Sequence, residues 1–218
     1  MSYRGPEITA GHFNRLPHAR EVFPYLDEHP LHDTLVEKLR AVFLQHGTWQ
    51  SFGLSTVHRH FDLTPQERLV EYHSIATPWE EPKHLAEVDG HILPANWTYL
   101  DGVLTSYEYR FTTTSEMERG PVPTLPTSFV ESLYDVLREH GLESRYGIAL
   151  LPEGAHDPSN PPRLEFTAGR ANITVPFSSA MEEKMAAKML YFFPCIDPLL
   201  DAEYDGPRMR HCAVCVRC

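Results

Sequence analysis

Two histidines one residue apart, His58 and His60, are the side chains of this sequence best suited to chemistry. They lie near the end of the run Phe52–Phe61, which we expect to be a β-strand. Residues two apart in a strand share one face, so both imidazoles should point the same way as Leu54 and Thr56. Such a pair can bind one metal ion. It can equally act as an acid and a base, because histidine titrates near neutral pH.

A neighbouring strand supplies candidates for a third group. The segment 68–75 is predicted to run antiparallel to the histidine strand, across a turn that contains Pro65. Glu71 and His73 share one of its faces. Two histidines and a carboxylate would bind a divalent Zn, Fe or Cu ion and leave positions open for oxygen or substrate. The alternative is a structural histidine pair at a solvated sheet edge.

The C-terminal tail is a second metal-binding candidate. It carries His211, Cys212, Cys215 and Cys218 at close spacing. Thiolates spaced in this way bind soft ions such as Zn²⁺. A closed zinc site usually joins two such groups, and the tail has one. A redox role, ligands that meet Cys195, and cysteines without a role therefore stay open.

Aromatic residues of a hairpin are candidates for the wall of a pocket. Tyr107 and Tyr109 share one face of the segment 103–111, either as core residues or as pocket residues beside the histidines. Glu108 and Arg110 lie on the opposite face, where we expect a surface pair.

Common cofactor and protease signatures are missing from the sequence. It has no phosphate-binding glycine loop, no G-x-G-x-x-G, no H-E-x-x-H and no G-x-S-x-G. We therefore expect no nucleotide cofactor. The two hypotheses are a small enzyme acting on a small organic molecule, as a lyase, isomerase, cyclase or metal-dependent oxygenase, and a non-catalytic binding or interaction protein. Under the enzyme hypothesis His58, His60, Glu71, Tyr107 and Tyr109 form the site.

Two resemblances bear on the histidine strand. Gly53, His58, His60 and Glu67 stand in the order of the first cupin motif, a glycine, a His-x-His strand and then a glutamate, although the spacing differs at both ends. No second cupin motif follows, and the helical segments do not suit a small β-barrel. The run from Gly53 to His-Arg-His-Phe also resembles small ascomycete fungal proteins to which no activity is assigned. That resemblance implies a fungal, cytosolic origin.

The elements that must position these residues indicate an α+β fold, with an antiparallel sheet and helices on one face. We expect helices over 33–45, 128–140 and 181–193, a hairpin around Asp101-Gly102, and strands near 146–151, 163–168 and 172–177. Residues 77–95 are expected to be a loop. The predicted organisation is an extended arm (1–30), a first α–β half (31–111), a linker (112–126), a second half (127–193) and a cysteine-rich tail (194–218).

An internal echo supports the two halves. Leu35–Leu54 and Phe129–Ile148 align at an offset of 94 residues, and both read as an amphipathic helix, a glycine and a strand. The echo indicates either a duplication or a common helix–glycine–strand pattern that unrelated segments can share. A duplicated domain would have a cleft, or a face for a second protomer, where its halves meet.

Composition limits the partners. The net charge is -11 over 218 residues, and no basic run is present. Nucleic acids and anionic membranes bind clustered Lys and Arg, so neither is an expected partner. The sequence has no apolar stretch long enough to span a bilayer and no apolar N-terminal segment. We therefore expect a cytoplasmic protein with reduced cysteines and a small-molecule ligand.

Overall fold

The computed structural model describes residues 8–80, 88–118, 122–157, 159–161, 163–176, 186–192 and 210–216. The helices are α1 (Ala10–Phe13), α2 (Ala19–Glu28), α3 (Asp33–Gln45), α5 (Thr114–Met117) and α6 (Thr127–Glu139). The strands are β1 (Phe52–Thr56), β2 (Glu67–Tyr72), β3 (Ile75–Glu80), β4 (Gly90–Leu100), β5 (Val103–Thr113), β6 (Tyr146–Leu150), β7 (Arg163–Ala168), β8 (Ala171–Pro176), β9 (Ala186–Phe192) and β10 (Arg210–Val216). The fold is α+β, as predicted.

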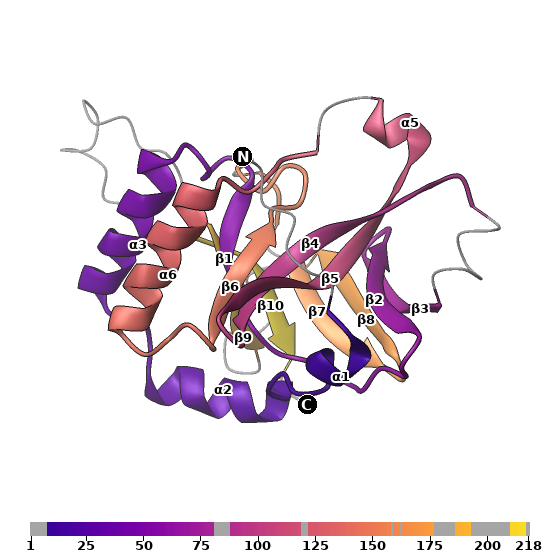
Figure 1. The fold of residues 1–218 in the computed structure, drawn as a ribbon, viewed down its shortest axis with the longest axis horizontal. Coiled ribbons are helices and arrows are strands. Elements are labelled where there is room, and N and C mark those ends of the chain that lie inside the picture. Colours follow the sequence, from indigo (N-terminus) through magenta and orange to yellow (C-terminus); the bar gives the residue numbers. More distant parts are fainter. Residues whose placement is uncertain are drawn as a thin grey trace.

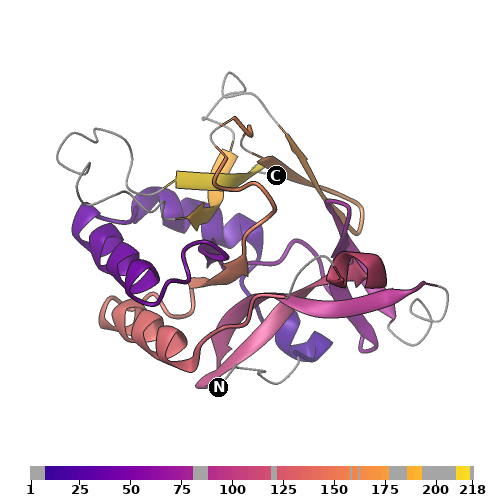
Figure 2. The same cartoon turned by 90° about the horizontal axis from the view of Figure 1, so that it is seen from above.

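The strands form one curled sheet that closes in the order β1-β6-β4-β5-β2-β3-β8-β7-β10-β9. Most neighbours are antiparallel, but β2 runs parallel to β5 and β10 runs parallel to β7. Helices α3 and α6 lie side by side against one part of the sheet (Figures 1 and 2). The sequence argument against a barrel was wrong, because the helices lie outside the closed sheet and do not interrupt it.

Helices α3 and α6 cover β1 and β6 because each has one apolar stripe. Leu35, Leu39 and Phe43 of α3 meet Phe129 and Leu133 of α6 in a single buried cluster. These positions recur every three or four residues, which places them on one helix face. Both helices were predicted from this spacing, and the observed bounds lie within about one residue of the predicted ones.

The internal echo has a counterpart in three dimensions. Leu54 and Ile148 are equivalent in the echo, and they are also directly paired where β1 runs antiparallel to β6. The flanking pair Thr56–Tyr146 and its counterpart Phe52–Leu150 are exchanged by the same rotation. The two α-then-β segments therefore meet across a local two-fold axis.

The two faces of β1 and β6 differ in side-chain size. Phe52 and Leu54, with Tyr146 and Ile148, join the helix-side cluster. The alternating residues on the opposite face are Gly53, Ser55, Gly147 and Ala149. Small residues on that face leave room inside the sheet.

The hairpin at Asp101-Gly102 was predicted correctly. Asp101 has φ 50° and Gly102 has φ 80°, the positive values that a two-residue type I′ turn requires. Strand β4 begins six residues before the predicted strand 96–100, and β5 ends two residues after the predicted strand 103–111.

Three other expectations were wrong. Residues 8–30 carry the helices α1 and α2 instead of a wholly extended arm. The expected loop 77–95 contains most of β3 and the start of β4, which pair with β2, β8 and β5. The expected helix 181–193 contains a strand, β9, over its described part. Because β9 packs between β1 and β10, sheet pairing overrides its helical periodicity.

The partner of β2 was also misplaced. The predicted antiparallel pairing of the segment 68–75 with the histidine strand does not occur. β2 instead lies between β3 and β5, while β1 pairs with β6 and β9. Of the helices that the structure describes, none is long and apolar enough to cross a membrane.

Candidate functional site

His58 and His60 follow β1 instead of lying within it, because the strand ends at Thr56. The bonds Val57 N–H to Arg145 O and Arg59 N–H to Pro17 O fix this segment on both sides of His58. The two rings nevertheless converge, as the sequence predicted. Their Nε2 atoms are 3.0 Å apart, and the ring planes meet at 83°.

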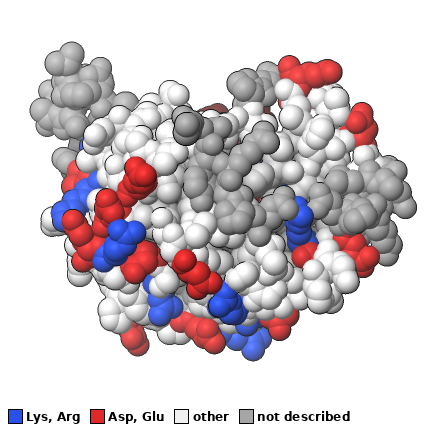
Figure 3. Space-filling model, in the orientation of Figure 1, with Lys and Arg blue, Asp and Glu red and all other residues white. Residues whose placement is uncertain are grey.

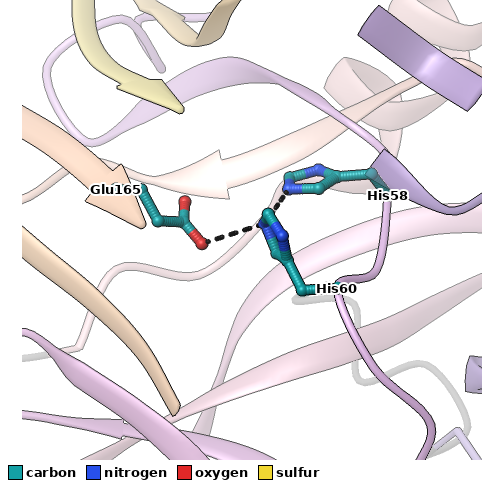
Figure 4. A group of neighbouring side chains, drawn as sticks. All are labelled: His58, His60 and Glu165. Carbon is teal, nitrogen blue, oxygen red and sulfur yellow. Dashed lines mark hydrogen bonds and ion pairs between the residues drawn. The ribbon is translucent and has the colours of Figure 1, made fainter. Parts of the chain in front are cut away.

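The third converging group is Glu165 of β7. Its Oε1 lies 3.4 Å from His60 Nε2, and the ligand atoms of His58, His60 and Glu165 all lie within 4.8 Å of one another. In Figure 4, dashed lines join the Glu165 carboxylate and the His58 ring to the same nitrogen of His60. We call these three residues the His–His–Glu group. It can hold a metal ion.

The distances within the group suit one shared ion. With metal–ligand bonds of about 2.1 Å, a 3.0 Å separation between Nε2 atoms corresponds to a ligand–metal–ligand angle of roughly 90°. The 3.4 Å separation between His60 Nε2 and Glu165 Oε1 corresponds to roughly 108° on the same assumption. Both angles lie between the octahedral and tetrahedral values, and the ligand atoms of His58 and Glu165 lie within 4.8 Å of each other.

A backbone contact fixes the orientation of His58. Its Nδ1 lies 2.9 Å from the carbonyl oxygen of Thr56. A carbonyl only accepts, so Nδ1–H donates and the neutral ring keeps its lone pair on Nε2. Metal-binding histidines are held in the same way, with the second nitrogen donating to a carbonyl or carboxylate.

Burial sets the charge of the group. Burial, with the nearby His60 as the second cause, lowers the pKa of His58 to about 4. Burial alone would raise the pKa of Glu165, but the hydrogen bond from His60 and the charges of both histidines lower it. At pH 7 the group therefore offers a neutral imidazole and a carboxylate, which are the forms that bind metals.

A cavity of about 130 Å³ lies inside the curled sheet beside the group. His58 and Glu165 line it, together with Glu108, Arg110 and Arg163. The remaining lining side chains come mainly from β1, β2, β4, β5, β6 and β8: Ser55, Leu69, Glu71, Ala76, Ala95, Asn96, Tyr107, Tyr109, Ala149, Leu150, Pro152, Asn172 and Thr174. An apolar cavity of about 150 Å³ holds benzene, so this polar cavity has the volume for a small organic molecule.

Glu108 faces this cavity and does not form the expected surface pair with Arg110. Asn96 Nδ2 donates to its carboxyl group. Burial, followed by the charge of Glu165, raises the pKa of Glu108 to about 8, so its carboxyl group is mostly protonated at pH 7. Arg110 instead donates to Glu71, with Nη2 and Oε2 3.3 Å apart.

The structure brings several of the predicted residues together. Glu71, Tyr107 and Tyr109 line the same cavity as His58. Tyr107 Oη lies 3.4 Å from Ser55 Oγ, and burial raises the pKa of Tyr107 well above its usual value. Tyr109 donates to the Ser106 carbonyl oxygen, 3.3 Å away.

Other predicted residues lie elsewhere. His73 is in the turn between β2 and β3, with φ 48°, and its ring centroid lies 4.0 Å from that of Tyr72, with the two planes tilted by 48°. It is not part of the His–His–Glu group. His211, Cys212 and Cys215 belong to β10, of which the structure describes the backbone alone, and Cys195 and Cys218 lie outside the described residues.

Sequence reasoning missed Glu165 and gave Glu108 the wrong surroundings. Glu165 lies 105 positions after His60, in a strand that no local pattern links to β1. The sequence signal for Glu108 is its place on the polar face of a long central hairpin. This face indicates a buried carboxyl group only once the sheet is known to close. Together these residues define an α+β protein with a candidate two-histidine, one-carboxylate metal site beside an internal polar cavity.

Comparison with known proteins adds no identity to this description. The chain matches no protein-family model, no curated protein and no solved structure.

Proposed function

We propose that the protein is a metal-dependent enzyme that binds one divalent transition-metal ion through His58, His60 and Glu165. Its substrate is a small polar molecule in the adjoining cavity. The observation that carries this proposal is the convergence of three metal-ligand atoms within 4.8 Å of one another at the wall of an internal cavity. Three protein ligands leave coordination positions for water or substrate, which is typical of catalytic metal sites.

The lining of the cavity favours proton-transfer chemistry. Glu108 and Tyr107 are buried proton donors beside the group, and Glu71 and Arg110 form an ion pair across the cavity wall. A lyase or an isomerase needs such donors and a Lewis acid. An oxygenase would use the same ligand set with iron, and the identity of the bound metal separates these reaction classes.

Metal analysis of purified full-length protein tests the proposal. Inductively coupled plasma mass spectrometry should find one metal ion per chain, and a Co²⁺-substituted sample should show d–d absorption. His60→Ala and Glu165→Gln should each weaken Co²⁺ binding by at least about a hundred-fold, because each removes a direct ligand. Circular dichroism checks that both variants fold.

Two control variants separate this site from the other metal candidates. His73→Ala should keep full metal content, because His73 lies outside the group. The triple variant Cys212→Ser, Cys215→Ser, Cys218→Ser should also keep it. Metal retained by His60→Ala and Glu165→Gln but lost from the triple variant would place the ion at the tail and overturn the proposal.

A further inference from the structure

The cavity beside the His–His–Glu group contains a cation with unused hydrogen-bonding capacity. Among the described residues, Arg163 donates from Nη2 to Ser74 Oγ and has no carboxylate partner. Its Nε is buried and has no hydrogen-bond acceptor in the described part of the chain. Arg110, the other cavity arginine, donates to Glu71.

An anionic ligand would satisfy Arg163. A guanidinium group stays charged at all physiological pH values, and a buried N–H without an acceptor is costly. Its Nε and Nη atoms form a planar fork that matches the two oxygens of a carboxylate. Ser74 uses one of the donors and leaves the Nε–H available.

The position of Arg163 relates it to the metal ligands. Arg163 and Glu165 are two residues apart in β7, so their side chains leave the same face of the strand, about 7 Å apart. Both line the same cavity. A molecule of only a few carbon atoms can therefore reach from the guanidinium to an ion beside Glu165.

Charge and volume limit the ligand further. Glu71 neutralises Arg110, and Glu165 would be engaged by the metal, so among the described lining residues Arg163 and the ion are the positive charges that remain for a ligand. The cavity has a volume of about 130 Å³, which suits a molecule close to benzene in size.

We infer that the ligand is a small oxygenated carboxylic acid, of the 2-hydroxy or 2-oxo type. Arg163 binds the carboxylate of this ligand, and the hydroxyl or oxo oxygen of the ligand faces the metal ion. This inference rests on the proposed metal-dependent function and names its substrate class. Arg163 is then a specificity residue that selects anions over neutral molecules of the same shape.

Lactate and lactamide are matched probes for this inference, because they share size and hydroxyl group and differ in charge at one end. Isothermal titration calorimetry on Co²⁺-loaded protein should show lactate binding at least about ten-fold more tightly than lactamide. Equal binding of the two probes to protein that holds one Co²⁺ would overturn the inference and leave the proposed metal site intact. Failure to bind Co²⁺ would instead contradict the metal site. Metal-free protein titrated in parallel shows whether the lactate preference exists without the ion.

Variants assign the preference to Arg163. Arg163→Gln should remove the lactate preference while keeping Co²⁺ stoichiometry, and Arg163→Lys should keep part of it. Arg138→Gln, at an exposed arginine of α6, should change neither. A lactate preference that survives Arg163→Gln would overturn the assignment.

Discussion

The two faces of β1 and β6 border regions of different character. On one face, large apolar side chains of α3, α6 and both strands pack together, with Leu39, Phe43, Phe129, Leu133 and Leu137 fully buried. On the other face, small residues border a cavity lined by charged groups. The helix-side core stabilises the fold, and the cavity offers chemistry. A substitution should therefore act on stability or on ligand binding according to the face it reaches.

The surface adds little to this division. On the face seen in Figure 3, acidic and basic side chains of the described residues intermingle over the helices. Exposed ion pairs such as Lys38–Glu139, 3.4 Å apart between α3 and α6, are worth about 0–1 kcal/mol each.

The largest expected effect is in the helix-side core. Phe129 is fully buried, and its ring meets that of Phe43 edge-on at 5.0 Å. Phe129→Ala should lower the free energy of unfolding by about 3–5 kcal/mol, because it removes apolar contacts and leaves a cavity. Urea denaturation measures this loss. Arg138→Ala, on the exposed side of the same helix, is the control and should change stability by less than about 1 kcal/mol. A similar small loss for Phe129→Ala would mean that the helix-side core does not hold the fold.

The second effect tests how closely the strands approach one another. A Cβ atom at Gly147 would collide with the carbonyl oxygen of Trp97, which is backbone and cannot rotate away. Gly147→Ala should therefore cost about 1–3 kcal/mol of stability, as measured by urea denaturation. Gly11→Ala is the matched control, because the nearest described atom to its Cβ would be Thr9 Oγ1, at 3.8 Å. If Gly147→Ala is as stable as the wild type, β4 and β6 are not packed as closely as described.

Elements that depend on local spacing could be predicted from the sequence, and elements that depend on distant strand partners could not. Helix α3, helix α6 and the Asp101-Gly102 hairpin follow from local spacing and turn chemistry, and they were placed correctly. The pairing of β2 and the strand character of β9 depend on partners far along the chain, which periodicity does not encode. The turn at His73 and Ser74 also lacked a signal, since both have positive φ without the usual Asn or Gly.

The candidate site shows the same limit. His58 and His60 were found because they are neighbours in the sequence. Glu165 joins them only because β7 enters a closed sheet through β8 and β10. Glu108 was expected at the surface because one face of an antiparallel sheet is often solvated. Closure of the sheet covers that face and turns an ordinary surface carboxylate into a buried one.

The third prediction concerns the polar interior and depends on pH. The pKa of Glu108 rises from 4.5 to about 8 on folding, so the folded protein binds more protons than the unfolded chain between these values. The stability from Glu108 is therefore fully present below about pH 4.5 and is lost as the pH rises through 8. Glu108→Gln removes this dependence. We expect the variant to gain at least about 1 kcal/mol relative to the wild type between pH 5 and pH 9.

Urea denaturation at several pH values, with a chelator in every sample, measures that gain. Glu139→Gln, at an exposed glutamate of α6, should leave the pH profile unchanged. Parallel pH profiles for the wild type and Glu108→Gln would show that the carboxyl group is ionised in the folded protein. They would place Glu108 in contact with solvent instead of in a closed polar interior.

The smallest effect should come from Tyr107, whose ring belongs to a buried apolar cluster and whose side chain also lines the cavity. Its hydroxyl lies 3.4 Å from Ser55 Oγ, a long hydrogen bond, and the whole residue is buried. Tyr107→Phe keeps the ring, so the free energy of unfolding should change by less than about 1 kcal/mol.

Tyr109→Phe is the matched comparison, because that hydroxyl contacts Ser106 Oγ at 3.1 Å and the Ser106 carbonyl oxygen at 3.3 Å. A larger loss for Tyr107→Phe than for Tyr109→Phe would mean that the hydroxyl at the cavity wall stabilises the fold. The division between a stabilising core and a chemical cavity would then be less complete than the packing of β1 and β6 indicates.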